Sequence, residues 1–186
     1  MSLLRFCQWL ASTRGSIALH ESLWGYPAIA TVHMMALPLF VGMIAILDLR
    51  LLGVRMPDVP VSEIAQRLLP WVAGGFVVLI LSGSLLFYAD PIRYYPNIFL
   101  RLKLALLVAS GVNAWGFHRS GYLTAAERGL NPASRGAKAA GLLSLLLLAA
   151  IILAERLIAY YDEWFDCGRH PHSAIVTFIG GCAASR

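Results

Sequence analysis

Charged residues are scarce in this sequence. Of its 186 residues, 13% are Asp, Glu, Lys or Arg, whereas 59% are apolar, and the mean hydropathy is +0.69. A soluble domain carries about 25% charged residues. The composition therefore excludes an ordinary water-soluble fold and predicts an integral membrane protein.

Several function-bearing patterns are also missing. The sequence contains no nucleotide-binding loop, no nucleophile placed beside a base, no internal repeat and no low-complexity segment. The net charge is +5, but the cations are scattered and form no basic stripe, so we expect contact with lipid and none with nucleic acid. Any enzymatic role would depend on a cofactor or on a partner: a redox protein, a quinone, or another subunit of a homo- or hetero-oligomer.

Long apolar runs dominate the rest of the chain. A helix needs about 20 residues to cross the hydrocarbon core of a bilayer. Four runs approach that length, at residues 27–47, 69–89, 97–117 and 139–160. The sequence thus predicts an all-α integral membrane protein, an antiparallel bundle of four transmembrane helices at residues 21–161 with a tail at 162–186.

The segment before the bundle, residues 1–20, is predicted to form a short interfacial helix. It lacks the long apolar region and the cleavage site of a signal peptide, so we expect it to be retained. Arg5 and Arg14 would face the lipid head groups. The side chains that would enter the membrane surface are Leu3, Leu4, Phe6, Trp9 and Leu10.

Topology is predicted from the cations outside the runs. The loops after the first and third runs form one side of the membrane, and the termini and second loop form the other. The first side carries Arg50, Arg55, Arg67, Arg119, Arg128, Arg135 and Lys138, and the second carries Arg5, Arg14, Arg93, Arg169 and Arg186. The positive-inside rule then places both termini in the periplasm of a bacterium, with the chain in the inner (plasma) membrane.

The predicted topology bears on the cysteines of the tail. Cys167 and Cys182 would face an oxidising compartment, where a disulfide between them could form; in the inverted topology they would be free thiols. The run from Cys167 to His172 also contains a weak metal-binding pattern, because His170 and His172 follow the cysteine closely.

Polar residues inside the runs gather in one membrane layer. From the helical rise, His33 lies about 9 Å into the first run and Lys103 about 9 Å into the third, whereas Glu155 and Arg156 lie about 6–8 Å from the same surface. Buried charges in a membrane are costly and mark functional or structural sites. This layer is the candidate site, and Glu155 is also a potential ion-pair partner of Lys103.

Helix geometry separates the two cations of the third run. Arg101 and Lys103 are two residues apart, a rotation of about 200°. We expect Arg101 to extend to the head groups and Lys103 to face the bundle. The second run reaches the same layer at Ser82, Gly83 and Ser84, small residues that allow close helix approach or leave space for a flat ligand.

A second polar group is expected near the opposite surface. Asp48 would pair with Arg50 or cap a neighbouring helix, and Asn113 would hydrogen-bond between helices. His118 is predicted to lie at the interface. These roles are structural.

Several stretches carry a resemblance to known proteins. They are His33, DLRLLG at 48–53, LLPW at 68–71, Gly75-Phe76, SGSLLF at 82–87, and NIFLRLKLALL at 97–107 with Asn113. Over residues 22–118 the chain resembles a family of small bacterial four-span proteins of unknown function. It is more distantly similar to copper-resistance D-type membrane domains and to HemJ-type haem-binding protoporphyrinogen oxidases, whose first-span His and third-span Lys correspond to His33 and Lys103.

The resemblance implies a haem b or copper site in the bundle. In the haem interpretation, the protein takes part in electron transfer or a haem-linked redox reaction, with His33 as an axial ligand. Lys103, with Arg101 or Arg156, would pair with the propionates, and Ser82, Gly83 and Ser84 would admit the porphyrin edge. His118 is too far away to share the iron, so the second-ligand candidates are His20, His170, His172 and Met34, or the position is open.

Two alternative functions fit the same residues. Met34, Met35 and Met43 provide soft ligands near His33, which would suit copper handling. A cofactor-free structural or anchoring subunit of a membrane complex would instead use the Lys103–Glu155 pair to fix helix register.

Overall fold

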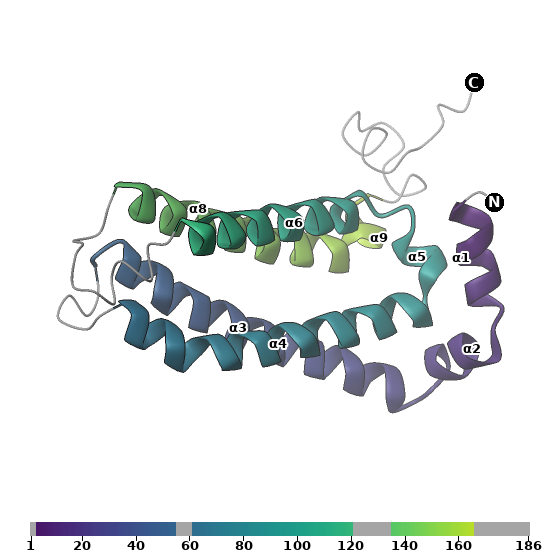
Figure 1. Ribbon diagram of the computed structural model, residues 1–186. Helices are drawn as coiled ribbons and strands as arrows, with labels where there is room; N and C mark the ends of the chain where they lie inside the picture. Colours follow the sequence, from purple (N-terminus) through teal and green to yellow (C-terminus); the bar gives the residue numbers. More distant parts are fainter. Residues whose placement is uncertain (1–2, 55–60, 121–134, 166–186) are drawn as a thin grey trace, which may run out of the picture.

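The computed structural model describes residues 3–54, 61–120 and 135–165, and these residues form helices and no strands. Four of the helices are long and apolar enough to cross a membrane: α3 (Gly25–Leu51), α4 (Val61–Ala89), α6 (Ile98–Arg119) and α8 (Arg135–Ala159) (Figure 1). The predicted all-α four-span bundle is confirmed. Cys167, His170, His172 and Cys182 lie outside the described residues.

Helix α4 begins well before the apolar run predicted at 69–89. Its first turns are amphipathic, with Val61, Ile64 and Ala65 buried and with exposed Glu63 and Arg67 paired at 2.8 Å. The apolar run begins only after these two charged residues. The helix includes them because they occupy only one of its faces.

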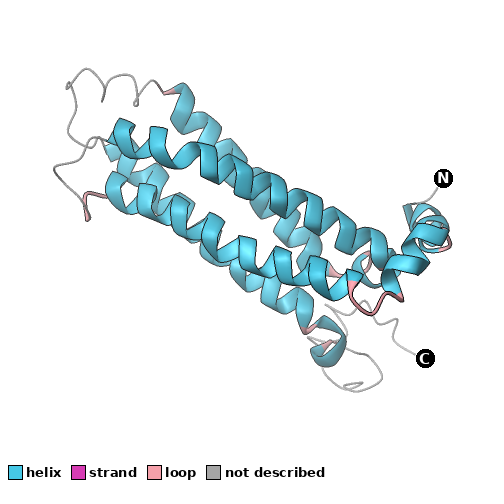
Figure 2. Ribbon diagram, turned by 90° about the horizontal axis from the view of Figure 1, so that it is seen from below, coloured by secondary structure: helices cyan, strands magenta, loops and turns pink. Residues whose placement is uncertain are grey.

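The four long helices form two antiparallel pairs. Helix α3 packs against α4, and α6 packs against α8, while the two pairs meet chiefly along α3 and α8. Figure 1 shows the pairs as two layers, and Figure 2 shows the long helices running side by side. Gly141 brings α8 close to α3, because a Cβ there would lie 3.2 Å from the carbonyl oxygen of Asp48. Among the described residues, α4 and α6 are not a closely packed pair.

Short helices lie at the end of the bundle where α3 begins and α4 ends (Figure 1). The predicted single interfacial helix is two helices, α1 (Leu3–Ala11) and α2 (Arg14–His20), because Thr13 caps α2 by accepting a hydrogen bond from the backbone N–H of Ser16. The Ser16 hydroxyl donates to the carbonyl oxygen of Tyr88 at 2.8 Å, which fixes α2 to the end of α4. Exposed apolar side chains of α1 suit a membrane surface; they are Leu3, Leu4, Phe6 and Trp9.

Two asparagines connect α6 to α8. Asn113 donates to the carbonyl oxygen of Ala140 at 3.0 Å, which confirms the predicted interhelical hydrogen bond. Asn97 is 2% exposed and accepts from the backbone N–H groups of Phe99 and Leu100, so it caps α6. Its amide also donates to the carbonyl oxygen of Ile158 at 3.4 Å.

We predict that Asn97→Ala lowers the free energy of unfolding by about 1–2 kcal/mol, because it removes a helix cap at a buried position. Asn97→Asp keeps the accepting oxygen and should recover most of that loss. Thermal unfolding in detergent, followed by circular dichroism, measures both. Thr31→Ala is the control, since this exposed hydroxyl bonds only within its own helix; an equal effect of Asn97→Ala and Thr31→Ala would contradict the prediction.

Candidate functional site

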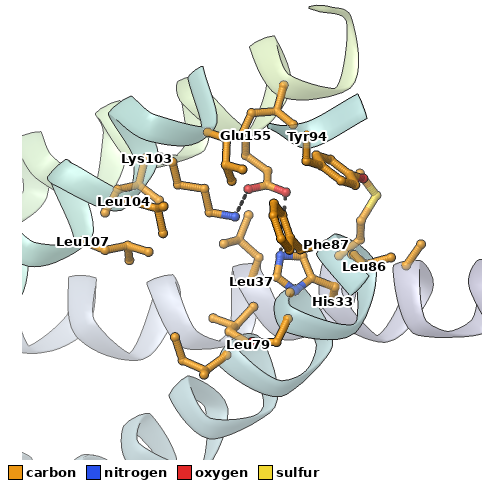
Figure 3. A pocket seen from close by; sticks show the side chains of 18 of the residues that line it. His33, Leu37, Leu79, Leu86, Phe87, Tyr94, Lys103, Leu104, Leu107 and Glu155 are labelled. Atoms are coloured by element: carbon orange, nitrogen blue, oxygen red, sulfur yellow. Dashed lines mark hydrogen bonds and ion pairs between the residues drawn. The ribbon is translucent and has the colours of Figure 1, made fainter. Parts of the chain in front are cut away.

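Three polar side chains meet between the two helix pairs. Lys103 from α6 pairs with Glu155 from α8, and the Nε2 atom of His33 from α3 lies 3.7 Å from Oε1 of Glu155 (Figure 3). His33 is 5% exposed. The predicted polar layer is thus confirmed for these three residues. Arg156 is exposed and does not join them.

Hydrogen bonding fixes the tautomer of His33. The Ser82 hydroxyl donates its single hydrogen to the carbonyl oxygen of Val78 at 2.6 Å. The 2.8 Å contact between Nδ1 of His33 and Oγ of Ser82 must then be donated by the imidazole. In the neutral ring the lone pair is left on Nε2, the atom that faces Glu155.

Gly83 allows the imidazole to lie against α4. A Cβ at this position would be 3.2 Å from Cε1 of His33 and 3.8 Å from Nδ1. The expectation of small residues beside the layer therefore holds, with Ser82 and Gly83 touching His33 and Ser84 lining the adjoining space.

A cavity of about 580 Å³ adjoins the three polar groups. Its size is typical of cofactor and small-molecule sites, which span about 300–1,000 Å³. All four long helices contribute to an apolar lining that includes Leu37, Phe40, Phe76, Leu79, Phe87, Leu104, Leu107 and Ile151. Of the lining residues on α4 and α6, Phe76, Ile80 and Leu104 are 44%, 46% and 55% exposed. The cavity therefore opens toward lipid where these two helices do not pack.

The end of the cavity near the short helices is polar. Tyr26 and Tyr94 contact each other through their hydroxyls at 3.2 Å, and Arg93 of α5 (Pro91–Tyr94) also lines the space. Arg93 bonds Asp162 of α9 (Tyr161–Trp164) at 2.5 Å. Burial and the hydrogen bond with Tyr26 raise the pKa of the Tyr94 phenol, so it is neutral at pH 7. Sequence reasoning missed this rim, because Arg and Tyr next to a span are typical of any membrane interface.

The other residues predicted to bind a cofactor do not all line the cavity. Arg101 is exposed and reaches back over the ring of Tyr95 at 5.5 Å, so it separates from Lys103 as expected and does not line the cavity. Met34 lines the cavity, whereas His20, at the end of α2, does not. In the described part of the chain, no group of three or more His, Cys, Asp or Glu side chains is arranged to hold a metal ion.

These features define a class: a multi-pass membrane protein whose four apolar helices line a cavity with a His–Glu–Lys cluster. The chain belongs to the Family of unknown function (DUF6644), whose pattern matches residues 24–161. The predicted membership in such a family is confirmed, and the match continues past residue 118 through the fourth span. No curated protein and no solved structure matches the chain. The similarity to copper-resistance D-type and HemJ-type proteins stays a prediction.

We predict that Lys103→Met and Glu155→Gln each destabilise the protein by about 3–5 kcal/mol, because each leaves one buried charge without its partner. The double variant should recover much of that loss, since it buries no charge. Thermal or chemical unfolding in one detergent measures the full cycle. Additive losses in the double variant would show that the two side chains are not coupled.

We predict that Gly83→Ala lowers the melting temperature relative to Gly74→Ala. Both changes improve helix propensity by about 1 kcal/mol, but only Gly83 faces a close neighbour, because a Cβ at Gly74 would meet nothing within 4 Å. The displaced imidazole would lose its hydrogen bond to Ser82. Equal melting temperatures for the two alanine variants would contradict the close packing of His33 on α4.

Proposed function

We propose that the protein is a membrane b-type haem protein that takes part in electron transfer or a haem-linked redox reaction. The observation that supports this proposal best is the position of His33: its Nε2 atom is directed at Oε1 of Glu155 at 3.7 Å, and both side chains line an apolar cavity of about 580 Å³. Imidazole nitrogen is a common axial ligand of haem iron.

The surroundings of His33 fit an iron ligand. A metal-binding histidine commonly donates its other ring N–H to an oxygen acceptor, which fixes the tautomer and the ring orientation. Ser82 supplies that acceptor here, and Gly83 leaves room for the ring. Apolar side chains line most of the cavity, as the porphyrin faces require.

The cations of the cavity suit the anionic propionates of haem. Lys103 and Arg93 both line the space, so Arg93 replaces Arg101 and Arg156 as the better candidate beside Lys103. Each cation already has a carboxylate partner, Glu155 or Asp162 respectively. A bound propionate would be a second anionic partner for each cation.

When bound, the haem would supply a one-electron couple between ferric and ferrous iron. The chain would contribute an oriented imidazole, cationic anchors and a water-poor environment. We place this chemistry in a bacterial inner (plasma) membrane with both termini in the periplasm, from the distribution of cations in the sequence. A redox protein or a quinone would exchange the electron.

A cofactor-free anchoring subunit is the second candidate. The Lys103–Glu155 pair favours it, because a buried pair can fix the register of two helices. Such a role does not require a cavity of about 580 Å³. Copper handling is less favoured, since Met35 is 66% exposed and only Met34 of the adjacent methionines lines the cavity.

We predict that protein purified in detergent after growth with ample haem shows a Soret band that shifts on reduction with dithionite. His33→Ala should abolish or shift this band, because the variant lacks the axial nitrogen. His118→Ala is the matched control and should keep the band, because His118 is exposed in the last turn of α6. A folded, colourless and metal-free wild-type protein would contradict the proposed function and favour the anchoring role.

A further inference from the structure

The cavity has donor groups on both of its walls. His33 comes from the α3–α4 pair, whereas Glu155 and Lys103 come from the α6–α8 pair (Figure 3). A flat group between the pairs would therefore have an imidazole on one face and a carboxylate on the other. Sequence reasoning considered Glu155 only as the ion-pair partner of Lys103.

The distance between Nε2 of His33 and Oε1 of Glu155 can be compared with the distance between two ligands of one metal ion. Zinc binds imidazole nitrogen at about 2.0–2.1 Å and carboxylate oxygen at about 2.0–2.2 Å; at bond lengths of this order, two opposite ligands lie about 4.0–4.3 Å apart and two adjacent ones about 3 Å apart. The observed distance between Nε2 of His33 and Oε1 of Glu155 is 3.7 Å. This value lies between the two separations, and the two atoms would have to move apart by a few tenths of an ångström to become opposite ligands of one metal.

The two oxygens of Glu155 have different neighbours. Oε2 pairs with Lys103, whereas Oε1 faces His33. Lys103 therefore stabilises the carboxylate as an anion and orients it, and it leaves one oxygen directed at the opposite wall. An anionic oxygen suits ferric iron, because the ferric porphyrin core carries one positive charge and a buried charge is stable only when it is compensated.

We propose that Glu155 is the second axial ligand of the haem iron, bound through Oε1 and oriented by Lys103. This inference rests on the proposed function. Of the ligands expected from the sequence, Met34 is next to His33 on the same helix and belongs to the same wall, and His20 does not line the cavity. Glu155 is the described side chain that faces Nε2 of His33 from the opposite wall.

The test compares Glu155→Gln with Lys103→Met in the haem-loaded protein. Glu155→Gln removes the anionic donor, so we expect an altered ferric spin-state signal, a more positive midpoint potential and tighter binding of added imidazole. Lys103→Met keeps the carboxylate donor but removes the cation that orients it, so we expect a smaller change in the ferric spectrum than Glu155→Gln gives. A purely structural ion pair would give the same changes in both variants.

The axial role of Glu155 can be tested even if one of the single variants fails to fold. The double variant Lys103→Met with Glu155→Gln leaves neither member of the ion pair without its partner. It keeps Arg93 for the propionates, so it should load haem, more weakly than the wild type, and show the spectral change of Glu155→Gln. If the Glu155 variants load haem and match the wild-type spectrum and potential, while His33→Ala loses the band, the axial role of Glu155 is overturned and the haem function stands. A wild-type protein without haem overturns both.

Discussion

The cost of holding charge inside a bilayer is the constraint on which the rest of the structure depends. A lysine or glutamate in hydrocarbon needs a partner, and Lys103 and Glu155 supply each other with one. Their contact ties α6 to α8 at one depth and leaves the second oxygen of Glu155 directed at the facing pair of helices. His33 lies there, held by Ser82 and seated against Gly83. The cluster is thus shared between the two pairs.

Uneven helix packing provides the space around this cluster. Gly141 lets α8 approach α3 closely, which joins the two pairs along one side. On the other side, the described parts of α4 and α6 do not pack together, and partly exposed side chains such as Phe76 and Leu104 line the opening. In water such an opening would expose apolar surface at high cost, but in a bilayer lipid covers it. The membrane therefore permits a cavity beside a buried ion pair.

The sequence predicts much of this arrangement, and the features that it does not predict are missed for physical reasons. Apolar runs predict the four spans, and the helical rise predicts the common depth of His33, Lys103 and Glu155. A rotation of about 200° between residues two apart separates Arg101 from Lys103. The same reasoning fails for Arg156, since depth alone does not show that it points about 100° away from Glu155. The tautomer of His33, the rim at Arg93 and Tyr94, and the opening between α4 and α6 depend on which helices pair and how each is rotated, which hydropathy does not determine.

The central claim is that the two helix pairs hold one flat prosthetic group between His33 and Glu155. The most direct measurement is an experimental structure of the protein purified with its native contents from cells supplied with haem. We expect planar density with a metal at its centre in the cavity, flanked by Nε2 of His33 and Oε1 of Glu155. A cavity that contains only lipid tails, with the His33–Glu155–Lys103 cluster intact, would contradict it.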